Sequence, residues 1–356
     1  MRTNIFKSII LVLLSIGLTT MAFSAKKHGD FSKPNKKVFN INKGALLDID
    51  CEFTDIKAFN WDKDQISVEV IITVDAKNEE KANDKFDRVH VKLSGTSDVV
   101  NIKTSLSNDY FGNHNNNIDI EVLIYYPEYI QLKLENEFGN SLFENINESV
   151  DVDISYGNFT AGNLISNELD LKAEFGKIEV IRFQAGDAHV SYGEFAAQIV
   201  GDLRLESEFS SNEIDYAEKV NVHSAYDKIY FRKLNSGRIE QEFTNLRINK
   251  LTKNLKMTTS YGSFKLDNIA IDFETIDIES EFTGLILYLN TNTSFGFQVS
   301  SDMGSFKYPK DLATVTKYQK EMFELEIEGY FGNTEDPKSQ LILNLENASA
   351  SIKIND

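Results

Sequence analysis

An aromatic residue returns at a nearly fixed interval through the middle of this chain. Successive members are 17 to 21 residues apart: Phe138, Tyr156, Phe175, Tyr192, Phe209, Tyr226, Phe243, Tyr261 and Phe282. A period sustained over so many copies is typical of stacked repeats, in which each copy buries its apolar face against the next. A helical stripe of aromatics would need a spacing near 3.6 residues, and the sequence does not show one.

Each copy has the pattern of two short strands joined by a bend. Apolar residues recur four and six positions before the aromatic and three and five positions after it, which is the period-two alternation of a half-buried strand. We expect the aromatic to fill the inner corner of the bend. Glycine often follows the aromatic and reaches backbone angles that other residues avoid. The predicted bend residues are Gly139, Gly157, Gly176, Gly193 and Gly262.

These repeats predict an all-β fold, a single-stranded parallel β-helix or β-solenoid with about 17–18 residues per coil. The residue just before the aromatic supports that coil length because it alternates between Glu and a small residue, as in Ser155, Glu174, Ser191 and Glu208. Stacked coils of this length would separate the like charges, which are destabilising on adjacent strands. A two-sided coil of about 35 residues, with a Phe side and a Tyr side, remains an alternative.

The flanking sequence divides the rest of the chain. Residues 1–24 have a basic start, a short apolar run and a small-x-small cleavage site, which predict a secretory signal peptide. Residues 25–36 form a polar N-terminal stretch. Residues 37–127 are β-rich, with one short helix capped by Asp75 and with Glu79 and Glu80 in its first turn. The repeats occupy 128–310, and 311–356 is expected to cap the open end of the stack.

Composition excludes several classes of function. The formal net charge of −18 opposes binding to nucleic acid. No later apolar run is long enough for stable membrane insertion once the signal is removed. Cys51 is the single cysteine, so no internal disulfide forms, and its place in a strand-like segment predicts a buried, inert thiol.

The search for chemistry finds repetition rather than a unique site. There is no catalytic motif and no zinc-ligand spacing, and Asn108–Asp119 is better explained as a turn than as a calcium loop. We therefore expect no enzyme activity, no metal centre and no cofactor. The candidate binding residues form an outward acidic strip along the coils: Glu174, Glu206, Glu208, Glu240, Glu242, Glu279 and Glu281. Such a strip predicts solubility, or weak binding of divalent cations or a basic partner.

The segments "KVFNINKGALLDIDCEFTDIKAFNWDKDQISVEVIITV" and "YYPEYIQLKLENEFGN", together with the Ser-Tyr-Gly and Glu-Phe-Gly repeats, resemble the DUF4097 putative-adhesin family of Bacteroidetes envelope proteins, which is related to GIN-domain adhesin heads. The resemblance implies an exported, non-catalytic β-solenoid of the periplasm or cell surface of a Gram-negative bacterium. Its partner would be an envelope protein or a glycan. The alternatives are a polysaccharide lyase or hydrolase on the same scaffold, and a periplasmic envelope-stress factor linked to an anti-sigma system.

Overall fold

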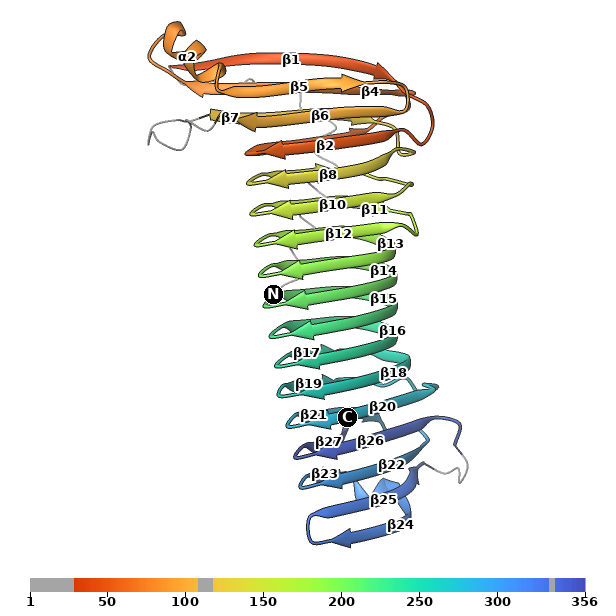
Figure 1. Cartoon of the computed structure of the whole chain (residues 1–356). Coiled ribbons are helices and arrows are strands. Elements are labelled where there is room, and N and C mark those ends of the chain that lie inside the picture. The colour runs from red at the N-terminus through yellow and green to blue at the C-terminus, as the bar shows by residue number, and fades with distance from the viewer. Residues whose placement is uncertain (1–28, 108–117, 333–336, 356) are drawn as a thin grey trace.

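The computed structural model describes residues 29–107, 118–332 and 337–355. The predicted signal peptide, residues 1–24, and most of the Asn108–Asp119 turn lie outside them. The described residues form 27 strands in one sheet, one α-helix and one short 3-10 helix, η3 (Lys310–Leu312). Most strands pair in parallel and stack into a long column (Figure 1). The all-β prediction with a single helix is confirmed.

Two rows of strands run along the column, and each aromatic turn joins one row to the other. The row before the turns contains, in pairing order, β6 (Val99–Leu106), β2 (Leu46–Glu52), β8 (Gln131–Glu137), β10 (Val150–Ser155), β12 (Leu169–Glu174), β13 (Lys177–Ser191), β14 (Glu194–Glu208), β15 (Ser211–Ala225), β16 (Lys228–Glu242), β18 (Leu251–Ser260), β20 (Thr275–Glu281), β26 (Gln340–Glu346), β22 (Phe295–Asp302), β25 (Glu324–Phe331) and β24 (Ala313–Glu321). An extra strand, β5 (Val89–Gly95), pairs antiparallel with β6.

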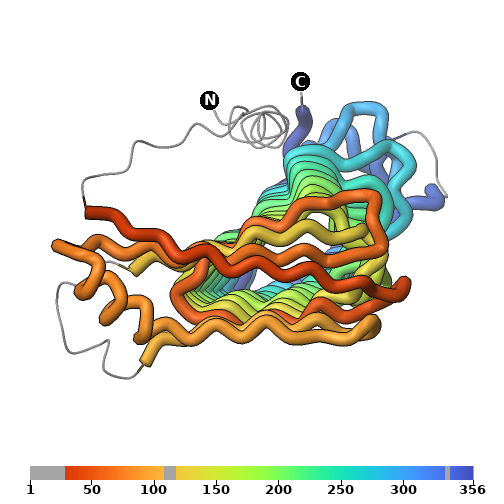
Figure 2. The backbone as a smooth tube through the Cα atoms, turned by 90° about the horizontal axis from the view of Figure 1, so that it is seen from above, coloured from red at the N-terminus to blue at the C-terminus, as the bar shows by residue number. Residues whose placement is uncertain are grey.

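The row after the turns is built in the same way. It contains β1 (Asp30–Asn40), β4 (Gln65–Asp75), β7 (Ile118–Tyr126), β3 (Thr54–Asn60), β9 (Asn140–Phe143), β11 (Asn158–Leu164), the first halves of β13 to β16, β17 (Asn245–Ile248), β19 (Ser263–Leu266), β21 (Gly284–Asn290), β27 (Ser349–Asn355) and β23 (Ser305–Lys307). We call one strand–turn–strand unit a rung. Figure 2 looks along the column, so that the central rungs lie over one another.

The register between rungs follows the repeat. Glu174 lies beside Ser155 on one side and Ser191 on the other, and Ser191 lies beside Glu208. Neighbouring central rungs are therefore offset by one repeat of 17 residues, and the alternative coil of about 35 residues is wrong. The predicted apolar columns fill the interior, as Leu171, Leu205 and Val222 show by their complete burial.

Three details at the ends of the chain differ from expectation. In the described part of the predicted polar stretch, residues 29–36, β1 begins at Asp30 and pairs antiparallel with β4. The helix α2 (Glu79–Phe86) is capped by Asn78, whose side-chain oxygen accepts a hydrogen bond from the Lys81 amide at 3.0 Å; Asp75 instead ends β4.

The C-terminal segment also differs, because only part of it caps the column. The antiparallel pair β25 and β24 forms that end, beyond β22. The last two strands, β26 and β27, insert as an inner rung: β26 lies between β20 and β22, and β27 lies between β21 and β23. The pairing register places them there although they come last in the chain.

Candidate functional site: an aromatic ladder beside an acidic strip

The turn aromatics form an exposed column of stacked rings, which we call the aromatic ladder. Neighbouring ring centroids are 4.7–5.0 Å apart and the ring planes differ by 1–13°. The ladder consists of Phe53, Phe138, Tyr156, Phe175, Tyr192, Phe209, Tyr226, Phe243, Tyr261 and Phe282. Nine of the rings are 43–52% exposed, and Phe53 packs partly against the core. The ladder extends over roughly 44 Å, since rungs stack about 4.8 Å apart.

The prediction that these rings fill the inner corner of the bend is wrong. Every ladder residue has a positive φ, between 48° and 60°, which is the left-handed region that L-residues other than glycine rarely adopt. The strand alternation that places Leu171 and Ala173 in the core therefore stops at Phe175, whose side chain projects outward. The left-handed backbone costs about 1–2 kcal/mol per residue, and each ring stack offsets about 0.5–1.5 kcal/mol of that cost.

The predicted glycines lie in the turns, but the physical reason is close packing. None of Gly139, Gly157, Gly176, Gly193 and Gly262 has a positive φ. A Cβ on any of them would lie 1.9–2.2 Å from a backbone carbonyl oxygen of the preceding rung. The rungs can approach this closely at the turn because the residue after the aromatic has no side chain.

At some turns the residue after the ladder aromatic is Ser210, Asp227 or Thr244 instead of glycine. The side-chain oxygen of each accepts a hydrogen bond from a backbone amide of the neighbouring rung. The hydroxyl of Ser210 accepts a hydrogen bond from the Gly193 amide at 3.1 Å, and the Thr244 hydroxyl accepts from the Asp227 amide at 3.1 Å. The Asp227 carboxylate accepts from the Ser210 amide at 2.6 Å and from the hydroxyl of Ser224 at 2.7 Å. Polar side chains therefore satisfy backbone amides beneath the ladder.

Asp227 is the buried carboxylate of this region, with 2% of its surface exposed. Burial raises its pKa, and hydrogen bonds from Ser207, Ser224 and the Ser210 amide oppose that rise. The group lies under the turn and contacts only protein, so we assign it a structural role.

The acidic strip lies beside the ladder. Glu174, Glu208, Glu242 and Glu281 are exposed, and each immediately precedes a ladder Phe. Their carboxylates make no ion pair and no side-chain hydrogen bond with any residue that the structure describes. They recur on every second rung, about 9.6 Å apart, because small residues occupy the rungs between them.

Two other members of the strip are already paired. Glu206 accepts from Arg204 at 2.8 Å and lies 3.2 Å from His189. Glu240 lies 3.2 Å from both Arg238 and His223. Glu279 is exposed and has no ion pair in the described part of the chain. The strip therefore offers free carboxylates beside the rings and partly neutralised carboxylates farther from them.

A shallow groove runs along each side of the ladder. The acidic groove is lined by the central part of the strip, namely Glu206, Glu208, Glu240 and Glu242, together with His189, His223, Ser191 and Ser260. The groove on the other side is lined by the ring edges with Asn158, Lys177, Ser211 and Lys228. Both grooves are open and cross several rungs, so they suit an extended partner better than a small enclosed ligand.

The ladder presents edges rather than faces to an incoming partner. Each inner ring has a neighbour about 5 Å away on both sides, as Phe175 has in Tyr156 and Tyr192. A sugar ring or a cation that needs an aromatic face finds none free along the interior of the ladder. The available groups are the tyrosine hydroxyls, the ring edges and the carboxylates.

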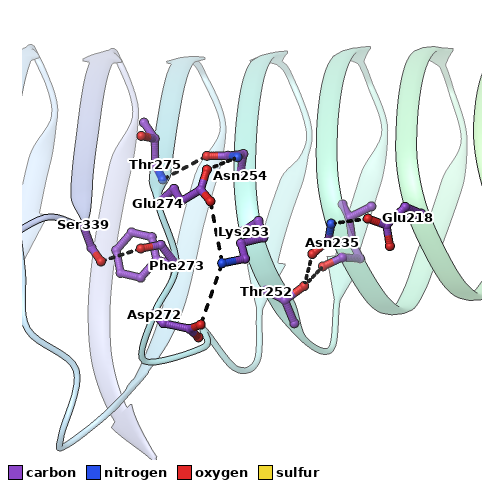
Figure 3. A network of polar contacts seen from close by, with 11 residues as sticks. Glu218, Asn235, Thr252, Lys253, Asn254, Asp272, Phe273, Glu274, Thr275 and Ser339 are labelled. Carbon is purple, nitrogen blue, oxygen red and sulfur yellow. Dashed lines mark hydrogen bonds and ion pairs between the residues drawn. The ribbon is translucent and has the colours of Figure 1, made fainter.

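The corner midway between two turns is held by polar contacts between rungs (Figure 3). The Asn235 amide donates to Glu218 at 2.7 Å, and the Thr252 hydroxyl donates to the Asn235 side-chain oxygen at 2.8 Å. Farther along the same corner, Asn254 donates to Glu274 at 2.8 Å. These chains of short contacts align successive rungs.

Metal binding and thiol chemistry find no support in the described residues. No group of three or more His, Cys, Asp or Glu side chains among them could hold a metal ion. Burial raises the pKa of the Cys51 thiol to about 11, which accords with the predicted inert cysteine. No helix among these residues is long and apolar enough to cross a membrane.

Sequence reasoning located the aromatics but missed that they are exposed, and it missed Phe53 as the first ladder member. The signal that could have shown both is the acidic or small residue before each aromatic. An outward residue is followed by another outward residue only where the strand is broken, and "CEFTD" repeats that pattern around Phe53.

No protein-family model matches the sequence, and a search of curated proteins gives no match. Several solved structures are similar. A putative adhesin from Parabacteroides distasonis is 13% identical with a TM-score of 0.33, covering 70% of this chain and 95% of that one. A putative lipid binding protein from the same species is 14% identical with a TM-score of 0.32, covering 70% and 94%. A putative cell adhesion protein from Clostridium sporogenes is 12% identical with a TM-score of 0.21, covering 91% and 100%. At these sequence identities and TM-scores, the similarity supports no statement about the activity of this chain.

Proposed function

We propose that the protein is an exported, non-catalytic β-solenoid of the cell envelope, of the DUF4097 putative-adhesin kind, which binds an extended partner along the aromatic ladder and the acidic strip. The observation that carries this proposal is repetition in register. The same free carboxylate and the same ring edge recur on every second rung from Glu174 to Glu281. A catalytic site needs one special arrangement of groups, whereas identical groups at equal intervals suit many weak contacts.

The chemistry of the face favours a basic partner. The four carboxylates next to the rings have no cation of their own in the described structure, and the chain carries a net charge of −18. A partner with ammonium or guanidinium groups along its length could pair with several of them together. Each exposed pair would contribute little, so affinity would depend on the number of pairs and would fall as salt rises.

A triple substitution tests this proposal. Glu174, Glu208 and Glu242 are changed together to Gln, and binding of a lysine homopolymer is measured by calorimetry at low and at physiological salt. We expect the triple variant to lose most of the binding that the parent shows at low salt. The matched control changes Glu148, Glu168 and Glu213 to Gln, three exposed glutamates outside the acidic strip with no ion pair in the described structure.

The control makes the same change of net charge. If both variants lose the same affinity, the attraction comes from overall charge and the proposed face is wrong. Calcium should bind the parent only weakly, because a central rung offers a single free carboxylate next to its ring. Hydrolysis or elimination of a polysaccharide by the purified protein would favour the enzyme alternative.

A further inference from the structure

The strand β24 is an edge strand at the end of the column opposite β1. β24 pairs with β25 on one side and with no other described strand. β24 lies at the end of the column (Figure 1), and all of its residues except Ala313 are exposed. Large apolar side chains at this tip are also open to solvent: Val315 is 38% exposed, Tyr318 60%, Phe323 63% and Met322 87%.

One edge strand at the opposite end of the column is protected. This strand, β1, contains Pro34, which cannot donate to a further strand, and three lysines, Lys33, Lys36 and Lys37. Proline and lysine on an edge are the usual obstacles to strand pairing between molecules. β24 contains no proline and two lysines, of which Lys317 is already paired with Glu326 and Glu328. β24 and β1 therefore differ in their capacity to accept another strand, and head-to-tail growth through β1 is opposed.

The sequence of β24 is complementary to itself when it runs antiparallel. Lys317, Gln319 and Glu321 alternate along the strand and so share one face. If two copies pair with Gln319 opposite Gln319, each Lys317 lies opposite the Glu321 of the other copy. This places an opposite-charge pair on both sides of the two-fold axis.

The same register also brings together two other exposed residues of the tip. It places each Tyr318 opposite a Lys320 of the second copy, which covers part of a ring that is open to solvent in the single chain. The pairing of β24 with β25 is irregular between Val315 and Lys317, so the regular register applies to Lys317–Glu321. Lys317 already contacts Glu326 at 2.9 Å and Glu328 at 3.2 Å. Its ammonium group carries three donors, so a third carboxylate is compatible with these contacts.

We propose that two copies of this chain associate tip to tip through antiparallel pairing of β24, centred on Gln319. The contact is isologous and closes as a dimer. A single pair of short strands buries less area than a standard stable interface, so the dimer should form in the micromolar range or above. This association is independent of the ligand-binding face, which runs along the side of the column.

The first experiment measures sedimentation velocity of the purified protein from low to high micromolar concentration. We expect concentration-dependent dimers. Glu321→Lys places lysine opposite lysine in the paired register and should weaken association about tenfold or more. The hairpin should stay folded, because Glu321 lies opposite Glu324 in β25 and the change replaces a like-charge pair. Glu148→Lys, in the middle of the column, is the matched control and should associate as the parent does.

The second experiment tests the register. Gln319→Cys puts a cysteine on the two-fold axis, where the Cβ atoms of directly opposed residues come close enough for a disulfide. Oxidation should link this variant into dimers much faster than Lys36→Cys, which places an exposed cysteine on β1. The buried Cys51 does not compete. A parent that remains monomeric, an unaltered association in Glu321→Lys, or equal linking of the two cysteine variants would each overturn the proposal.

Discussion

Phe175 offers the sharpest test of the turn. Its ring is 43% exposed and stacks on Tyr156 and Tyr192 at 5.0 Å, while its backbone is left-handed with φ 52°. Deleting a fully buried Phe side chain costs about 3–5 kcal/mol, so deleting this half-buried ring should cost about 2 kcal/mol. Phe175→Ala keeps the Cβ and with it the left-handed strain of about 1–2 kcal/mol.

Phe175→Gly removes that strain. We therefore expect the glycine variant to be more stable than the alanine variant by about 1 kcal/mol, after allowing for the greater freedom of glycine in the unfolded chain. Phe159 is the matched control, because it lies in β11 with its side chain completely buried. There Ala should cost about 3–5 kcal/mol and Gly about 0.5–1 kcal/mol more, which is the opposite order.

Urea unfolding followed by circular dichroism gives the four midpoints under one set of conditions. Comparing Ala with Gly at one position cancels most of the effect of losing the ring, which leaves the backbone contribution. If Phe175→Gly is less stable than Phe175→Ala by the same margin as at Phe159, the ladder residues do not carry left-handed strain and the account of the turn is wrong.

Three further predictions concern single side chains. Gly176→Ala puts a Cβ 2.2 Å from the Gly157 carbonyl oxygen and should lower the free energy of unfolding by about 1–3 kcal/mol, whereas Gly284→Ala, where a Cβ would meet nothing within 4 Å, should be nearly neutral in the same urea titration. Burial raises the pKa of Asp227 above its ordinary value of 3.8, so its contribution to stability is present at low pH and is lost as pH rises through the raised pKa. The stability of the parent relative to Asp227→Asn should therefore fall as pH rises above about 4, and a constant difference in urea midpoints would contradict this. The Cys51 thiol, with its pKa raised to about 11, should resist alkylation at pH 8 in the folded protein and react in denaturant; rapid labelling of the folded protein would show that the thiol is accessible.

The interior of the column could be predicted from the sequence because strand side chains alternate with a strict period of two. Leu171, Leu205 and Val222 occupy one column of the repeat and are all completely buried. The same rule failed at Phe175, since it holds only while the backbone stays extended. Nothing in a single copy of the repeat shows that the aromatic, rather than the following glycine, takes the unusual backbone angle.

The order of the last rungs could not be predicted for a different reason. The segment Gln340–Glu346 has apolar residues at Leu341, Leu343 and Leu345, the same period of two as the repeats, and would fit at the end of the stack or inside it. Its position between β20 and β22 depends on strand pairing between segments far apart in the chain. Likewise, Lys33, Pro34 and Lys36 suggested a polar stretch, although they mark a protected edge strand.

The alternation of Glu with small residues before the ladder rings holds inside the repeats and ends where the repeats meet other segments of the chain. Inside the repeats, Glu174, Glu208 and Glu242 each lie between small residues of the neighbouring rungs. Both junctions break this rule: Glu137 also lies beside Glu52, and Glu281 lies beside Glu346. Each junction joins the regular repeats to a segment that is distant in sequence. Inside the repeats, separation of like charges removes a repulsion of about 0.2–1 kcal/mol per pair, and the register that achieves it is the register that stacks the aromatic rings. A slip of a segment by one rung would still stack its aromatic on another ring but would place Glu beside Glu, so the Glu column favours the observed alignment over this competitor.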